Sequence, residues 1–312
     1  GAPDPIKFIN KEKSYLHFVA KVEKDDYLKR LLLNETFESI LKELSSKLPL
    51  KRVYEFVILK YLLQHKVITI QIARREILKH IKQVDDDSVL HAFETLNQDY
   101  YDSVQKKTKQ RLIIFKDYKA TKTLEFEKVL MDKEYYNFIN DVISYGINRY
   151  EKEFKSEYYG VPHFKLYEQY RMVDAALLSN YRKLHSSFRG SGLLANEKDY
   201  FLFIDLHKDE DIKDSLKYKD KFIDQKYFQW QTPNTTAQGS ERGQNIIYNK
   251  ERGYKLHLFV RKFKEIDGKI EPYIYIGKGN TVEYQGEKPI TIIFELENEI
   301  PIHLYREFTV KS

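Results

Sequence analysis

The stretch Tyr254-Lys255-Leu256-His257-Leu258-Phe259-Val260-Arg261-Lys262-Phe263 decides how the second half of this 312-residue chain folds. Leu256, Leu258 and Val260 occupy every second position, and this period is typical of a strand that buries one face. The segment 289–297 alternates in the same way. These two segments therefore predict a β-rich second half.

Further strand-like segments lie on both sides of this stretch. They are 199–206, 226–231 and 272–276. The segment Ile266-Asp267-Gly268-Lys269 predicts a hairpin turn, because glycine tolerates the positive φ that such a turn requires. We expect one helix at 168–185. The polar stretch 232–245 is predicted to be a surface loop, and it could enter the groove of a bound nucleic acid.

The first half of the chain is predicted to be helical. Apolar residues recur there with a period close to 3.6, the period of an amphipathic helix. The predicted helices are 27–48, 51–65, 73–81, one that contains Val89 to Leu96, and 132–155. The acidic turn Asp85–Ser88 supplies N-cap candidates for the helix that contains Val89. Pro49 ends the first of them, because proline lacks the donor that a continuing helix needs.

Two short strand signals interrupt these helices and suggest a winged helix. Val67–Ile70 is β-branched, and the segments 111–115 and 121–126 indicate a hairpin. Helix, short strand, helix, helix and hairpin is the element order of a winged helix, although a plain helical bundle fits the pattern as well. We predict an α+β chain with a helical domain at 1–158 and a β-rich domain at 159–312, divided near Gly160-Val161-Pro162.

The composition describes an ordinary globular protein and excludes several classes. Hydrophobic residues make up 42% and charged residues 32% of the chain, and no apolar run is long enough to span a membrane. Gly1–Pro5 is not a basic segment followed by an apolar one, so we expect no signal peptide and a cytoplasmic protein. No cysteine occurs, which excludes disulfides, thiolate catalysis and thiolate metal sites.

The net charge of +6 permits nucleic-acid binding without requiring it. Residues 1–150 hold 27 basic and 22 acidic residues, whereas 151–312 hold 26 and 25. The surplus therefore belongs mainly to the helical half.

Motifs for catalysis are weak in this sequence. It has no phosphate-binding loop and no dinucleotide fingerprint. His80–Asp87 fits the His-x-Lys-x4-Asp pattern of phospholipase-D-type nucleases, but it stands once, at a predicted helix end, and we interpret it as a solvated helix end. Asp205 and the acidic segment 209–213 could serve a metal-dependent nuclease, although a solvated turn is the simpler interpretation. We expect no catalytic residue, metal or cofactor in this chain.

Several segments of the second half, taken in order, resemble a known family. They are Arg189–Leu194, Asp199–Lys208, Asp214–Phe222, Phe228–Gln231, Gly243–Ile247, Leu258–Lys262 and Tyr275–Gly277. Over about 165–300 they resemble the family of domains of unknown function attached to the C-terminus of bacterial superfamily-two helicases. The chain also resembles the coupler and target-recognition parts of ATP-dependent, modification-dependent (type IV) restriction endonucleases.

This resemblance implies a function and partners. The chain itself would be no enzyme, and its partners would be the helicase and nuclease domains of an endonuclease and duplex DNA with 5-methylcytosine or 5-hydroxymethylcytosine. The resemblance also implies a barrel-like β domain similar to the SET-and-RING-associated readers, which flip the modified base into a pocket.

Candidate site residues follow from the needs of a flipped base and its phosphates. The pocket candidates are Trp230, Phe228, Tyr218 and Phe222 as stacking rings and Asp205 as an acceptor for the cytosine amine. Trp230 and Phe228 are two positions apart in an alternating strand and so share one face, and for both a place in the core is the alternative. The candidates for backbone and groove contacts are Arg189, Ser191, Lys217, Lys219, Arg242, Gln244, Arg261 and Lys262. A protein-interaction module that docks onto a helicase motor and an independent nuclease are the alternative functions.

Overall fold

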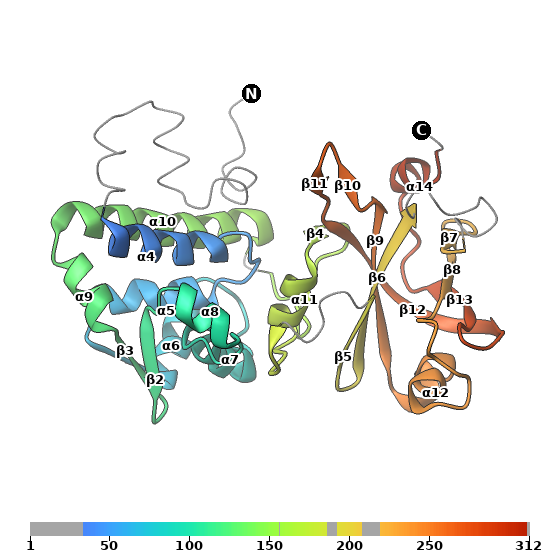
Figure 1. Ribbon diagram of the computed structural model, residues 1–312, viewed down its shortest axis with the longest axis horizontal. Helices are drawn as coiled ribbons and strands as arrows, with labels where there is room; N and C mark the ends of the chain where they lie inside the picture. Colours follow the sequence, from blue (N-terminus) through green and yellow to red (C-terminus); the bar gives the residue numbers. More distant parts are fainter. Residues whose placement is uncertain (1–33, 156, 186–191, 208–218, 311–312) are drawn as a thin grey trace. The chain divides into compact units, whose positions relative to one another are not determined.

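The computed structural model describes residues 34–155, 157–185, 192–207 and 219–310 (Figure 1). The chain divides into two compact units. Gly1–Val161 and Arg182–Ser187 form one, called here the helical unit; Pro162–Tyr181 and Phe188–Ser312 form the other, the sheet unit. The division thus follows Val161, and the sequence placed it after residue 158.

The helical unit holds seven helices and three short strands in its described part. The helices are α4 (Glu35–Lys47), α5 (Tyr54–Leu62), α6 (Ile70–Ile77), α7 (Asp86–Leu96), α8 (Ser103–Thr108), α9 (Leu124–Leu130) and α10 (Lys133–Phe154). The strands are β1 (Val67–Thr69), β2 (Ile113–Lys116) and β3 (Lys119–Lys122). The predicted strand at 121–126 is wrong in its second half, because the Thr123 hydroxyl accepts a hydrogen bond from the Phe126 amide and caps α9.

The element order of this unit is that of a winged helix. The antiparallel sheet has the order β1-β3-β2, and α6 and α7 lie between β1 and β2 in sequence. Asp85 caps α7 by accepting a hydrogen bond from the Ser88 amide, as the acidic turn predicts. Of the two interpretations that the sequence left open, the winged helix is therefore the one the fold matches.

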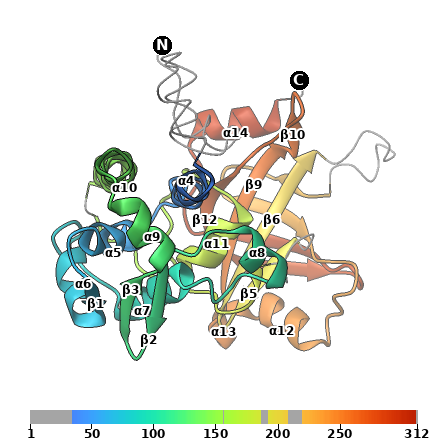
Figure 2. The ribbon, with the colours of Figure 1, turned by 60° about the vertical axis from the view of Figure 1, so that its left-hand side comes forward.

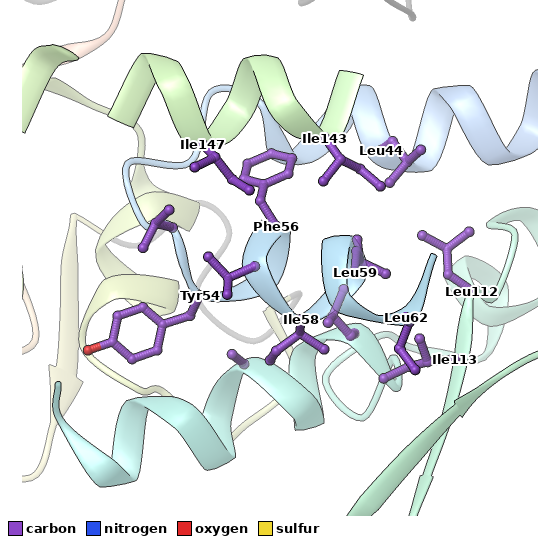
Figure 3. Close-up of a cluster of buried hydrophobic side chains, with 14 of the residues drawn as sticks. Leu44, Tyr54, Phe56, Ile58, Leu59, Leu62, Leu112, Ile113, Ile143 and Ile147 are labelled. Atoms are coloured by element: carbon purple, nitrogen blue, oxygen red, sulfur yellow. The ribbon is translucent and has the colours of Figure 1, made fainter. Parts of the chain in front are cut away.

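Helix α5 is the centre of this unit. Its side chains are buried on two sides, and Figure 3 shows Phe56 near Ile143 and Ile147 of α10. The Phe56 ring takes the space beside Gly146, where an added Cβ would lie 2.8 Å from three ring atoms. The absence of a side chain at this one position lets α10 approach α5 closely.

The sheet unit is built on one large mixed sheet. Its strands are β4 (Gln169–Tyr170), β5 (Leu193–Asn196), β6 (Asp199–His207), β7 (Lys221–Phe222), β8 (Tyr227–Gln231), β9 (Lys255–Phe263), β12 (Tyr273–Gln285) and β13 (Thr291–Leu296). A separate hairpin consists of β10 (Glu265–Ile266) and β11 (Lys269–Ile270), and the helices are α11 (Met172–Leu178), α12 (Glu241–Ile247), α13 (Asn249–Arg252) and α14 (Ile302–Thr309). The strands and the hairpin turn that the sequence predicts are thus confirmed. The helix expected at 168–185 is wrong in extent, since β4 precedes the short α11.

The sheet is open, so the predicted barrel is wrong. The strand order is β5-β6-β9-β12-β13-β8-β7, with β4 paired to β12, and within the described residues β5 and β7 are edges that do not pair with each other. β6 and β9 run parallel, whereas the other neighbours run antiparallel. Alternation in each strand fixes which residues share a face, but closure also needs the two edges to meet.

Both faces of this sheet are covered by its own unit. One face packs aliphatic residues of β6, β9 and β13 against Ile246 of α12 and Leu304 of α14. The opposite face is aromatic, with Phe201 and Phe259 beneath Phe164 and Tyr170 of the segment 162–181. Figures 1 and 2 place α14 and the pair α12–α13 at opposite ends of the strands. In the described ranges, no helix is both long and apolar enough to cross a membrane.

Candidate nucleic-acid interface

Three of the predicted pocket rings lie in the core of the sheet unit. Trp230 stacks on Phe294 of β13 at 5.7 Å between ring centroids, and only 4% of its surface is exposed. Phe228 is fully buried and meets Phe222 edge-on at 4.8 Å. Phe228 and Trp230 share one face of β8, as their spacing predicts, and this face is the one that packs inward. Neighbouring side chains cover the rings, so these three residues support the sheet in this conformation.

Asp205 and Arg261 form an ion pair with each other. They are opposite one another in the parallel register of β6 and β9, with Arg261 Nε 2.5 Å and Nη2 3.2 Å from the carboxylate oxygens of Asp205. Arg261 Nη1 also donates to the carbonyl of Glu271 at 2.9 Å, and the guanidinium lies 4.1 Å from the ring centre of Tyr273. The sequence assigned the two groups separate roles, at a base and at a phosphate, and the fold brings them together.

The other predicted contacts are distributed over the unit. Arg189, Ser191, Lys217 and Tyr218 lie outside the described residues, as does the acidic segment 209–213. The carbonyl of Lys219 accepts a hydrogen bond from Gln229, and Lys262 Nζ donates to the carbonyl of Val310. Arg242 and Gln244 lie on α12.

The predicted polar loop at 232–245 is a fixed segment that ends in a helix. The side-chain amide of Gln238 donates to the carbonyl of Gly286 at 2.7 Å. The backbone amide of Gln238 donates to the carboxylate of Glu287 at 3.0 Å. Ser240 then caps α12 through the Gly243 amide. A Cβ on Gly243 would lie 2.0 Å from the carbonyl oxygen of Ala237, so glycine is needed for this tight entry into the helix.

Two buried asparagines attach α12 and α13 to the sheet. Asn245 donates to the Tyr200 hydroxyl of β6 at 2.9 Å and accepts from Arg252 at 2.6 Å. Asn249 donates to Asn280 of β12 at 2.9 Å and accepts from the Thr281 amide at 3.0 Å. A buried amide with both of its ends bonded holds a single orientation. The backbone of both short helices is thus fixed on the sheet.

These contacts present exposed tyrosines and cations, the α12–α13 surface, formed by Arg242, Tyr248, Lys250 and Tyr284. The exposed carboxylates of Glu241, Glu251 and Glu283 lie next to them in sequence. Tyr248 and Tyr284 are 40% and 43% exposed, and their rings meet edge-on at 6.3 Å. The hydrogen bond between their hydroxyls, 3.4 Å apart, raises the pKa of Tyr248. Arg242 and Lys250 are exposed, and neither forms an ion pair within the described part of the chain. Such a surface can stack rings and contact phosphates.

Sequence reasoning missed Tyr248 and Tyr284. The predicted strand at 272–276 stopped too early, because β12 continues to Gln285 through a register shift between Thr281 and Glu283. This irregularity interrupts the alternation that would have placed Tyr284. The exposed tyrosine after the short α12 had no periodic signal of its own.

A second polar network lies on the aromatic face and is enclosed. His257 Nε2 is 2.7 Å from Asp199 Oδ1, and its Nδ1 is 3.0 Å from the Tyr275 hydroxyl. Burial lowers the pKa of His257, against the opposing effect of Asp199. Among the described residues, no group of three or more acidic or histidine side chains could hold a metal ion.

The nuclease-like pattern at His80 has separate structural partners. His80 follows the end of α6 and its Nδ1 bonds to Glu151 of α10. Asp87, the last residue of the pattern, lies in the first turn of α7 and accepts a hydrogen bond from Arg182 at 2.9 Å. The two residues therefore do not form one site, in agreement with the interpretation as a helix end.

Two families of unknown function match this chain. Residues 164–308, most of the sheet unit, match the domain of unknown function DUF3427. Residues 1–153 match a second domain of unknown function, DUF8090. No curated protein matches the chain. The first match covers the residues whose motifs led to the resemblance with a helicase-associated domain.

Proposed function

We propose that this chain recognises modified cytosine in duplex DNA as the targeting part of an ATP-dependent, modification-dependent restriction endonuclease. The resemblance of 165–300 supports this proposal, and the DUF3427 match covers the same residues. The structural observation that carries it is the α12–α13 surface, where exposed tyrosines and cations stand on a rigid base.

Each part of this surface has a defined task in the proposal. Tyr248 and Tyr284 stack on a base or on the sugar of a displaced nucleotide. Arg242 and Lys250 contact phosphates and so fix the register of the duplex. The asparagine contacts hold α12 and α13 in place before DNA arrives, which lowers the ordering cost of binding. Trp230 and Phe228 stabilise the sheet beneath, and Tyr218 remains a pocket candidate.

A titration with paired oligonucleotides tests this proposal. The two duplexes differ only in methylation of their cytosines, and we expect the wild-type chain to bind the methylated duplex more tightly. Loss of a base–aromatic stack costs about 1–3 kcal/mol, so Tyr248→Ala with Tyr284→Ala should weaken this binding by about tenfold or more. Tyr158→Ala, which removes a comparably exposed tyrosine from the helical unit, serves as the control.

The outcomes separate the candidate functions. Equal affinity of the wild-type chain for the two duplexes would reject modified-base recognition. Absence of DNA binding together with stable binding to an isolated helicase motor would instead favour the protein-interaction function. Retention of the preference in the double tyrosine variant would remove the α12–α13 surface from the proposal.

A further inference from the structure

Helix α7 of the winged helix is acidic where such helices usually meet DNA. In helix-turn-helix proteins the second helix enters the major groove. The solvent side of α7 carries Asp86, Asp87 and Glu94. Arg182 donates to Asp87 and Glu94 at 2.9 Å each, which occupies part of this side. Carboxylates at this position repel phosphates, so α7 is poorly suited to a groove.

The wing and the segment before it carry the opposite charge. Residues 103–122 contain seven basic residues and one acidic residue, a surplus equal to the net charge of the whole chain. We define the wing surface by its exposed members Lys106, Lys107, Lys109, Lys116, Tyr118 and Lys119. Figure 1 shows β2 and β3 as a hairpin that extends from the helices of this unit. Within the described residues, these five lysines form no ion pairs.

The wing surface is fixed to the end of α7. Asn97 accepts a hydrogen bond from the Phe115 amide of β2 at 2.9 Å and another from Arg111. Gln98 donates to the carbonyl of Lys109 at 3.4 Å. Phe115 also stacks on Phe93 of α7 at 4.9 Å between centroids. The backbone that carries Lys109 and Lys116 is therefore held against the end of α7.

Two features of the hairpin tip are unfavourable for folding. Lys116 and Lys119 are directly opposite in the register of β2 and β3, and like charges in such a pair destabilise a hairpin. Tyr118 has a φ of 61° in the turn and is 71% exposed. Glycine or asparagine suits that backbone better than a bulky residue. An anionic ligand would screen the two lysines, and the exposed Tyr118 hydroxyl could donate a hydrogen bond to it.

We propose that the wing surface binds the phosphate backbone of duplex DNA, independently of sequence and modification. Lysine is depleted from the cores of protein–protein interfaces, whereas it is a principal donor to phosphates. Val104 and Ile114 are also exposed in this segment, but the lysines outnumber them, and such a group of cations fits DNA better than it fits a protein. The inference rests on the proposed function only in taking duplex DNA as the ligand.

The test compares salt dependence in variants of the full chain. An unmodified duplex is titrated at several salt concentrations, with wild type, with Lys116→Gln plus Lys119→Gln, and with the control Lys128→Gln plus Lys133→Gln. The control removes two exposed lysines of α9 and α10 in the same unit. Each lost phosphate contact lowers the slope of log affinity against log salt by about 0.9. We expect the wing variant to lose about two in slope and about tenfold in affinity at low salt, and the control to match wild type.

Tyr118→Asn separates binding from folding. Asparagine tolerates the left-handed conformation, so thermal stability should stay equal or rise while DNA affinity falls. Wild-type affinity and slope in the wing lysine variant would overturn the proposal and leave an acidic protein as the partner of this surface. The ratio of methylated to unmodified affinity should not change in the wing variants. A ratio of one in the wild-type chain would reject the proposed function and leave this inference intact.

Discussion

Single residues in the sheet unit show how buried polar groups are accommodated. His257 is enclosed by Phe201, Phe164 and Tyr275, and both of its ring nitrogens have partners. Burial removes water from the imidazole ring, and this loss of solvation raises the free energy of the protonated form relative to the neutral form. Burial accordingly lowers its pKa, although Asp199 acts in the opposite direction. The folded chain therefore holds this histidine neutral at a pH where the unfolded chain begins to protonate it.

This lowered pKa predicts how stability depends on pH. Above the ordinary histidine pKa of about 6.5, folded and unfolded chains bind the same number of protons at this site. As the pH falls below that value, the unfolded state gains a proton first, so the free energy of unfolding decreases. Trp230 is the only tryptophan and lies in this unit, so its fluorescence reports unfolding there. Between pH 7.5 and 5, His257→Gln should lose less stability than wild type; an identical loss in the two would contradict the assignment.

The entry into α12 is an element whose geometry depends on one glycine. A Cβ at position 243 would collide with the carbonyl of Ala237, whereas one at Gly239 would meet nothing within 4 Å. We expect Gly243→Ala to reduce the free energy of unfolding by about 1–3 kcal/mol, the usual cost of overpacking. Gly239→Ala, in the same segment, should leave it nearly unchanged. Urea unfolding followed by tryptophan fluorescence measures both, and equal stability of the two variants would refute the proposed contact.

The elements also show where sequence reasoning succeeds and where it stops. Alternation located β8, β9 and β13, an apolar run located β6, and Asp85 marked the start of α7, because these signals are local. The same alternation put Phe228 and Trp230 on one face without saying whether that face is a pocket or a core. This choice depends on β13 and α14, which are distant in sequence. The contacts of Asn245 and Asn249 are long-range in the same sense, so no pattern announced them.

At the scale of the whole molecule, the two units differ in how they could contact DNA. The sheet unit is nearly neutral in charge, and its candidate contacts are a few residues on α12, α13 and β12. The helical unit carries most of the surplus charge, concentrated between Ser103 and Lys122. Specific readout by one unit and nonspecific phosphate binding by the other would be additive in free energy when one duplex engages both. The sequence could not exclude a barrel, because the pairing of the edge strands β5 and β7 depends on the complete sheet and not on any single strand.

The segment 162–181 belongs to the sheet unit and completes it on two sides. It adds β4 to β12 through Tyr170 and covers the aromatic face with Phe164, which contacts Phe201 and Phe259. Removing one buried aromatic side chain costs about 3–5 kcal/mol, and a domain has only about 5–15 kcal/mol in total. A fragment 182–312 should therefore be unfolded, while a fragment 162–312 should fold. Circular dichroism and the Trp230 emission maximum distinguish the two states, and a cooperative melting transition in the shorter fragment would show that the aromatic face needs no cover.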